Sequence, residues 1–309
     1  MANLHTKMNF FLENLLPMYP EDYTPTLEDN RARASVLTGE SEPVFQVENR
    51  VIPGPESEIP IRIYTPEGKG PLPIVVYFHG GGFVYGDLET HDSVCRRIVN
   101  ASQQIVVAVD YRLAPEHPFP AAPNDCYAAA KWVYENVAKL GGDQTRLSVA
   151  GDSAGGNLAT VVCLMAKEQG GLAISKQLLI YPVTDAFEPE KYPSYKENGT
   201  GYFLTTDTMG LFHQLYIQDE TYRKHPYAAP LYAPNLSGLP KALIITAEYD
   251  PLRDEGELYA NKLKESGVAV RLVREEGLIH GFLNLFSLMS ASEDIKEIYE
   301  YIGAFLKEN

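Results

Sequence analysis

A serine between glycines carries the strongest chemical signal in the sequence. The segment Gly151-Asp152-Ser153-Ala154-Gly155 follows the apolar run Leu147–Ala150 and precedes a helical pattern at 154–168. Between a strand and a helix, G-x-S-x-G is typical of a nucleophile elbow, a turn so sharp that the serine hydroxyl projects above the sheet. Glycines at its ends let the strand and the helix approach each other. We therefore expect Ser153 to be a nucleophile, beside a helix N-terminus that favours negative charge.

A second glycine-rich segment could supply the hydrogen-bond donors for that charge. His79-Gly80-Gly81-Gly82-Phe83 follows a β-rich apolar run. Because the glycines have no side chains, their backbone N–H groups would be accessible at the end of a buried strand. Such amides can bind the oxyanion that forms during acyl transfer. A phosphate-binding loop is disfavoured, because the chain lacks GxxxxGK[ST] and this segment misses the last glycine of GxGxxG. We expect His79 to brace the loop by a hydrogen bond, and the oxyanion hole to consist of the amides of Gly81, Gly82 and Ala154.

A serine hydroxyl is a weak nucleophile without a base and a carboxylate that orients the base. In the elbow fold these residues follow in the order serine, acid, histidine. Asp250 is the preferred acid because it lies in a loop before Pro251, whereas Asp254 is better placed to cap the next helix. His280 is the one histidine of seven that follows the expected last core strand. The acid candidates, all just after the apolar run 242–246, are Glu248, Asp250, Asp254 and Glu255.

The elements that must position these residues alternate between strands and helices. Runs typical of strands buried on both faces predict a parallel sheet, with helices on each side and right-handed crossovers. Two earlier strands, 42–50 and 59–65, are separated by a Pro-Gly-Pro turn at 53–55 and predict an antiparallel start. The buried runs are 74–78, 105–109, 147–150, 178–180, 242–245 and a sixth at 268–273, and the helical patterns are 90–102, 123–138, 154–168, 254–266 and 292–307.

Two segments fall outside that alternation. Near the N-terminus, apolar residues at helical spacing predict a short amphipathic helix that covers an apolar surface. Residues 183–240 contain repeated prolines, many aromatic residues and no strong strand pattern, and they are too long for a plain connection. A helix near 205–217 is expected there, capped by Thr205 or Thr206. We expect this insertion to form a lid or cap. The apolar residues of the N-terminal helix are Leu4, Met8, Phe11, Leu12 and Leu15.

Composition limits the possible partners. The chain has 309 residues, of which 45% are hydrophobic and 22% charged, and its net charge is −15. A strongly acidic surface disfavours binding to nucleic acids and to anionic membranes. No window approaches about 18 apolar residues, the N-terminus does not resemble a signal peptide, and three sparse cysteines form no CxxC pair. We expect a cytoplasmic protein with reduced thiols. We expect no metal or organic cofactor, since no HExxH or other histidine cluster with ligand spacing is present.

Five ordered motifs resemble the hormone-sensitive-lipase-type (bacterial family IV) esterases of the α/β-hydrolase superfamily. They are HGGG at 79–82, DYRLAPE at 110–116, GDSAGG at 151–156, DPLRDEG at 250–256 and HGF at 280–282. The resemblance implies a mostly parallel eight-stranded sheet, with Ser153 as nucleophile, Asp250 as acid and His280 as base. It also implies dimerisation through an edge strand near 268–273. The implied organisation is N-terminal cap helices at 1–40, a catalytic core at 41–182 and 241–309, and a cap insertion at 183–240.

The expected function is hydrolysis of short- to medium-chain acyl esters by a serine carboxylesterase, through an acyl-enzyme intermediate. A small-molecule ester is then the partner. An amidase or a deacetylase of acetylated small molecules could use the same triad. A ligand-binding protein on the same fold is disfavoured by His280, because the plant gibberellin receptors that resemble this fold lack the catalytic histidine. The residues that could line an apolar substrate pocket, or else pack the cap on the core, are Phe83, Phe203, Leu204, Phe212, Leu252 and Phe282.

Overall fold

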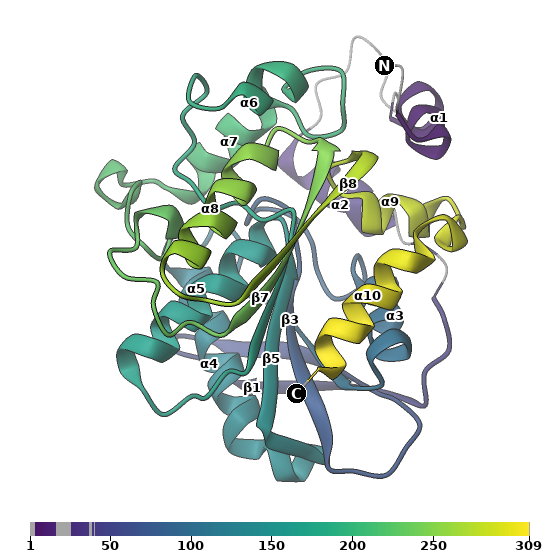
Figure 1. The fold of residues 1–309 in the computed structure, drawn as a ribbon, viewed down its shortest axis with the longest axis vertical. Helices are drawn as coiled ribbons and strands as arrows, with labels where there is room; N and C mark the ends of the chain where they lie inside the picture. Colours follow the sequence, from purple (N-terminus) through teal and green to yellow (C-terminus); the bar gives the residue numbers. More distant parts are fainter. Residues whose placement is uncertain (1–3, 17–25, 37–38, 40, 309) are drawn as a thin grey trace.

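The computed structural model describes residues 4–16, 26–36, 39 and 41–308. An eight-stranded sheet runs through the middle of the molecule in the order β1-β2-β4-β3-β5-β6-β7-β8 (Figure 1). β2 is antiparallel to both of its neighbours, and the pairings from β4 to β8 are parallel. The strands are β1 (Gln46–Pro53), β2 (Glu58–Thr65), β3 (Leu72–Phe78), β4 (Ile105–Val109), β5 (Gly142–Asp152), β6 (Lys176–Ile180), β7 (Lys241–Tyr249) and β8 (Val270–Ile279).

Helices cover both faces of the sheet because its central strands are apolar on both sides. Alternate side chains of a strand point to opposite faces, so β3 sends Ile74 and Val76 into one core and Val75 and Tyr77 into the other. The expected α/β fold, with a mostly parallel eight-stranded sheet, is confirmed. One core is covered by α4 (Ala121–Asn136), α5 (Ala154–Gln169) and α8 (Arg253–Glu265), and the other by α3 (Asp92–Ser102), α9 (Phe282–Leu288) and α10 (Lys296–Lys307), on opposite sides in Figure 1.

The outer strands differ most from the sequence prediction. β8 starts at Val270 and continues to Ile279, beyond the expected 268–273. Charged residues such as Arg274 and Glu275 interrupt the apolar pattern in the second half of this strand, so the sequence did not indicate its full length. They are tolerated because an edge strand exposes part of its length to water. β1 starts at Gln46, four residues after the expected start at 42, and it includes Pro53. The connection to β2 is therefore 54–57, and not the expected turn at 53–55. β8 is the edge that the expected dimer would use, and dimerisation stays a prediction.

The α-helices outside the core alternation lie near the end of the sheet toward which β8 points (Figure 1). The predicted amphipathic helix is confirmed as α1 (Thr6–Asn14), which buries Met8 and Phe11. Within the insertion, α7 (Thr206–Tyr216) follows Thr205, whose hydroxyl accepts a hydrogen bond from the Thr208 amide. α2 (Leu27–Val36) lies in the region where N-terminal cap helices were expected without bounds, and α6 (Pro193–Asn198) was not predicted. None of the helices among the described residues has both the length and the apolar character needed to cross a membrane.

Candidate active site

Ser153 lies in a strained turn between β5 and α5. Its φ of 56° and ψ of −119° are unfavourable for a residue with a side chain. Neighbouring backbone holds it there, since the Ser153 amide donates to the Ile180 carbonyl at 2.8 Å. The turn requires glycine at position 155, where a Cβ atom would lie 1.9 Å from the Phe78 carbonyl oxygen. The local geometry is therefore that of a nucleophile elbow.

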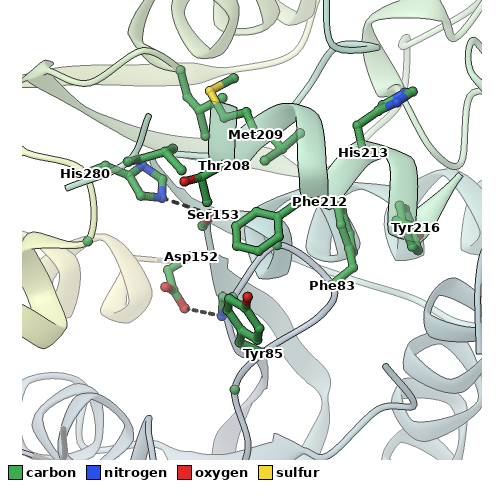
Figure 2. Close-up of a pocket in the computed structure, with 18 of the residues that line it drawn as sticks. Phe83, Tyr85, Asp152, Ser153, Thr208, Met209, Phe212, His213, Tyr216 and His280 are labelled. Atoms are coloured by element: carbon green, nitrogen blue, oxygen red, sulfur yellow. Dashed lines mark hydrogen bonds between the residues drawn. The ribbon is translucent and has the colours of Figure 1, made fainter. Parts of the chain in front are cut away.

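The structure brings Ser153, His280 and Asp250 into one hydrogen-bonded chain. His280 Nε2 lies 2.9 Å from Ser153 Oγ, and His280 Nδ1 lies 2.7 Å from Asp250 Oδ2 (Figure 2). Asp250 is 0% exposed, and its second oxygen accepts a hydrogen bond from the Leu252 amide at 2.8 Å. The Tyr181 ring packs against the imidazole at 4.7 Å between centroids. This arrangement can remove a proton from the hydroxyl while a buried carboxylate orients the base.

The other acid candidates serve the architecture around the triad. Glu248 accepts a hydrogen bond from the Gly277 amide at 2.7 Å, in β8. The prediction that Asp254 caps α8 is wrong: the N-cap residue is Leu252, and the Asp254 carboxylate instead accepts a hydrogen bond from the Ser194 amide of α6 at 2.8 Å. Glu255 is fully buried and accepts hydrogen bonds from the Thr184 amide and the Tyr195 hydroxyl. Burial raises the pKa of Glu255 to about 8.

The glycine loop after β3 makes a tight turn beside Ser153. Gly81 and Gly82 have φ values of 117° and 63°, which side chains rarely tolerate. Gly81 turns the loop by accepting hydrogen bonds from the amides of residues 84 and 85. Ala154 is the first residue of α5, so its amide has no carbonyl one helical turn earlier to bond. Gly81 and Gly82 line the same cavity as Ser153, which is where oxyanion donors must lie.

His79 lies behind the glycine loop. Its Nδ1 atom is 2.8 Å from the Gly80 carbonyl oxygen, and its ring stacks on Tyr111 at 4.2 Å. The Tyr111 hydroxyl donates to the His79 carbonyl at 2.7 Å. Burial, together with the nearby His91, lowers the pKa of His79 to about 4. A neutral ring in hydrogen-bonding distance of the loop agrees with the bracing role that the sequence predicted.

A cavity of about 330 Å³ adjoins Ser153 and His280. Five of the six expected pocket residues line it. Phe282 does not: it is fully buried in the core, with its ring edge-on to Tyr181 at 5.1 Å. Figure 2 shows Met209 on one side of Ser153 and Asp152 on the other. The lining residues from the expected set are Phe83, Phe203, Leu204, Phe212 and Leu252.

Sequence reasoning missed other apolar residues of the cavity wall. Met209 and Tyr216 follow helical spacing around Phe212 on α7, and that periodicity could have identified them. Leu285 and Leu288 of α9 also line the cavity, although no helix was expected there. The Phe11 ring of α1 meets Phe203 edge-on at 5.7 Å, so the N-terminal helix supports one wall.

Known proteins are similar to this chain over most of its length. A family model described as the α/β hydrolase fold matches residues 75–284. The carboxylesterase NlhH of Mycobacterium tuberculosis is 42% identical over 92% of this chain and 91% of its own length. The ethyl acetate hydrolase of Pseudomonas putida is 38% identical over 76% of this chain and 75% of its own length.

A solved structure of comparable size also matches. The hyperthermophilic esterase from the archaeon Pyrobaculum calidifontis is 42% identical and superposes with a TM-score of 0.89, covering 99% of this chain and 100% of that one. The agreement in fold and sequence extends over nearly the whole chain. The chain belongs to the α/β hydrolase fold family, as its resemblance to the hormone-sensitive-lipase-type esterases led us to expect.

Proposed function

We propose that the chain is a serine carboxylesterase that hydrolyses short- to medium-chain acyl esters. The single observation that carries the proposal is the hydrogen-bonded chain from Ser153 through His280 to the buried Asp250 carboxylate. The similarity to a carboxylesterase and to an ethyl acetate hydrolase supports the same reaction class. We assign Ser153 as nucleophile, His280 as general base and acid, and Asp250 as the carboxylate that orients it.

The proposed reaction proceeds through an acyl-enzyme. Ser153 Oγ attacks the ester carbonyl while His280 Nε2 takes the hydroxyl proton, and Asp250 stabilises the resulting imidazolium. The amides of Gly81, Gly82 and Ala154 bind the oxyanion of the tetrahedral intermediate. His280 then returns the proton to the leaving alcohol. In the second half of the reaction a water molecule attacks the acyl group and gives a proton to His280. His280 passes that proton to Ser153 Oγ as the acyl–oxygen bond breaks, which releases the carboxylic acid and regenerates the serine.

The size and lining of the cavity support a small acyl group. Ligand pockets span about 300–1,000 Å³, and the cavity of about 330 Å³ lies at the lower end. Aromatic rings and Met209 provide an apolar wall, which suits an acyl chain better than a polar or charged group. We propose that residues 183–240 and 1–40 act as the cap over this site, and that 41–182 with 241–309 form the catalytic core.

Hydrolysis of p-nitrophenyl acetate, butyrate, octanoate and palmitate tests the proposal, with Ser153→Ala beside the wild type. Fast turnover of the short esters is expected, and kcat of the variant should fall by at least about 10³-fold. A rate that rises steadily beyond about ten carbons would contradict the assigned substrate size. A folded wild type that cleaves matched amides but none of these esters would contradict ester hydrolysis itself.

A further inference from the structure

A buried carboxylate links the serine turn to the glycine loop. Asp152, the residue before Ser153, is 3% exposed. It accepts hydrogen bonds from the Tyr77 hydroxyl at 2.7 Å and from the Gly80 amide at 2.9 Å. Gly80 immediately precedes the proposed oxyanion donors. The distance between those donors and the serine therefore depends on where the Asp152 carboxylate lies.

The His91 imidazole lies against this carboxylate. Its Nε2 atom is 3.3 Å from Asp152 Oδ1 and 3.3 Å from the Gly80 nitrogen. The same atom is 2.9 Å from Nδ2 of Asn284 on α9, the helix that begins two residues after His280. Burial opposes ionisation of Asp152, but the neighbouring His91 and Tyr77 outweigh it and hold the pKa of Asp152 below its usual value. One imidazole thus touches three of the four segments that carry the proposed catalytic groups: the serine turn, the glycine loop and the start of α9. The fourth segment, with Asp250, follows β7.

The orientation of the His91 ring is fixed on its other side. His91 Nδ1 lies 2.9 Å from the Thr90 hydroxyl. That hydroxyl donates to the Asp87 carbonyl at 2.9 Å and accepts from the Asp87 amide at 2.9 Å. Because its one proton is engaged with Asp87, the hydroxyl accepts from His91, and Nδ1 carries a hydrogen. The ring is buried, so Nε2 is held facing Asp152, Gly80 and Asn284.

We propose that His91 is a positioning residue for the esterase reaction. It holds the serine turn, the glycine loop and the start of α9 in register, so that Gly81, Gly82 and Ala154 meet the oxyanion while Ser153 stays in line with His280. This role rests on the proposed function. A misplacement of about 1 Å in such a site can lower the rate about 10²-fold. The loss should appear in transition-state stabilisation, because His91, although it lines the cavity, is a buried polar ring and not one of the apolar side chains assigned to the acyl chain.

The test compares His91→Leu, which keeps bulk without hydrogen bonds, with His91→Gln, whose side-chain amide can reach the position of Nε2. His225→Leu, in the cap and outside the cavity lining, is the matched control. With p-nitrophenyl butyrate we expect kcat of His91→Leu to fall about 10²-fold with KM changed less than about threefold. His91→Gln should recover at least about tenfold of that loss. The control should match the wild type.

A second readout separates positioning from general damage to the fold. A trifluoromethyl ketone adds to the serine: the hydroxyl proton passes to His280, and the carbonyl oxygen becomes an anion in the oxyanion hole. Its affinity should fall in His91→Leu by the same factor as kcat/KM, whereas binding of 1-hexanol should not change. If His91→Leu fails to fold, Thr90→Val, which frees the ring to turn, should lower kcat about tenfold with normal thermal unfolding.

The outcomes distinguish the two proposals. A folded His91→Leu protein with wild-type kcat and ketone affinity would overturn the role of His91 and leave the esterase assignment intact. Equal losses of kcat and of 1-hexanol binding would also overturn it, since they would indicate a disordered site. A wild type that neither hydrolyses the ester nor binds the ketone would overturn both proposals.

Discussion

Asp250 Oδ2 lies 2.7 Å from His280 Nδ1, and the carboxylate is completely shielded from solvent. A buried carboxylate at this distance fixes the tautomer in which Nδ1 carries the hydrogen and Nε2 faces the serine. The second carboxylate oxygen is fixed by the Leu252 amide, so the acid itself cannot turn away. The orientation and the tautomer of His280 are therefore fixed before the substrate binds.

Asp250→Asn should therefore lower kcat by about 10⁴-fold, because an amide donor facing Nδ1 favours the wrong tautomer. Glu248→Gln, two residues earlier, is the control and should keep near-normal turnover. Steady-state kinetics at pH 7 check both variants, and circular dichroism checks folding. Comparable losses in the two variants would mean that the loop, and not the carboxylate, determines the rate.

Substituting Glu255 should change how stability depends on pH. The folded protein keeps the proton on Glu255 up to about pH 8, whereas the ordinary value is 4.5. Unfolding between these two values releases a proton, so the free energy of unfolding should fall as pH rises from about 4.5 to about 8. Below that window the contribution is fully present. Glu255→Gln lacks this proton release.

Urea unfolding at several pH values measures the effect. The stability of the wild type minus that of Glu255→Gln should decrease steadily across the window and level off above it. Glu265→Gln, on the exposed side of the same helix, is the matched control and should give a flat difference. A flat difference for Glu255→Gln as well would show that this carboxyl group is not held protonated in the fold.

Phe212 should limit the length of the acyl chain. Its ring stands over Gly82, where a Cβ atom would lie 2.2 Å from the ring, and edge-on to Tyr85 at 5.2 Å. Phe212→Ala should enlarge the cavity and raise the octanoate-to-butyrate ratio of kcat/KM about tenfold. Leu211→Ala changes an exposed neighbour on the same helix and should leave the ratio unaltered. An unchanged ratio in Phe212→Ala would place the acyl chain elsewhere in the cavity.

The serine turn and the glycine loop could be predicted from the sequence because each depends on residues close together in the chain. The serine turn depends on glycines within a few residues, and the order of acid and histidine follows from the order of parallel strands. The cavity wall was harder to predict. Phe282 follows His280 closely in the chain, yet α9 begins there and directs Phe282 into the core, whereas Leu285 and Leu288 face the cavity.

The proposed role of His91 is only weakly indicated by the sequence, in which Asp87, Glu89 and His91 after the glycine loop could either support the site or be solvated loop residues. His91 sits among loop residues that resemble a solvated turn, and its partners come from segments far apart in the chain: Gly80, Asp152 and Asn284. Local patterns carry no signal for such a cluster. Burial of the ring becomes evident only when β3, β5 and α9 are assembled around it.

Covalent labelling with a fluorophosphonate tests the central claim most directly, because the reagent reacts only with a serine activated by its surroundings. Intact-mass spectrometry and peptide mapping should show one adduct per chain, located on Ser153. The adduct should be absent in Ser153→Ala and should form far more slowly in Asp250→Asn. An adduct on another residue, or full ester hydrolysis by a chain whose Ser153 stays unlabelled, would contradict the assignment of this serine as the nucleophile.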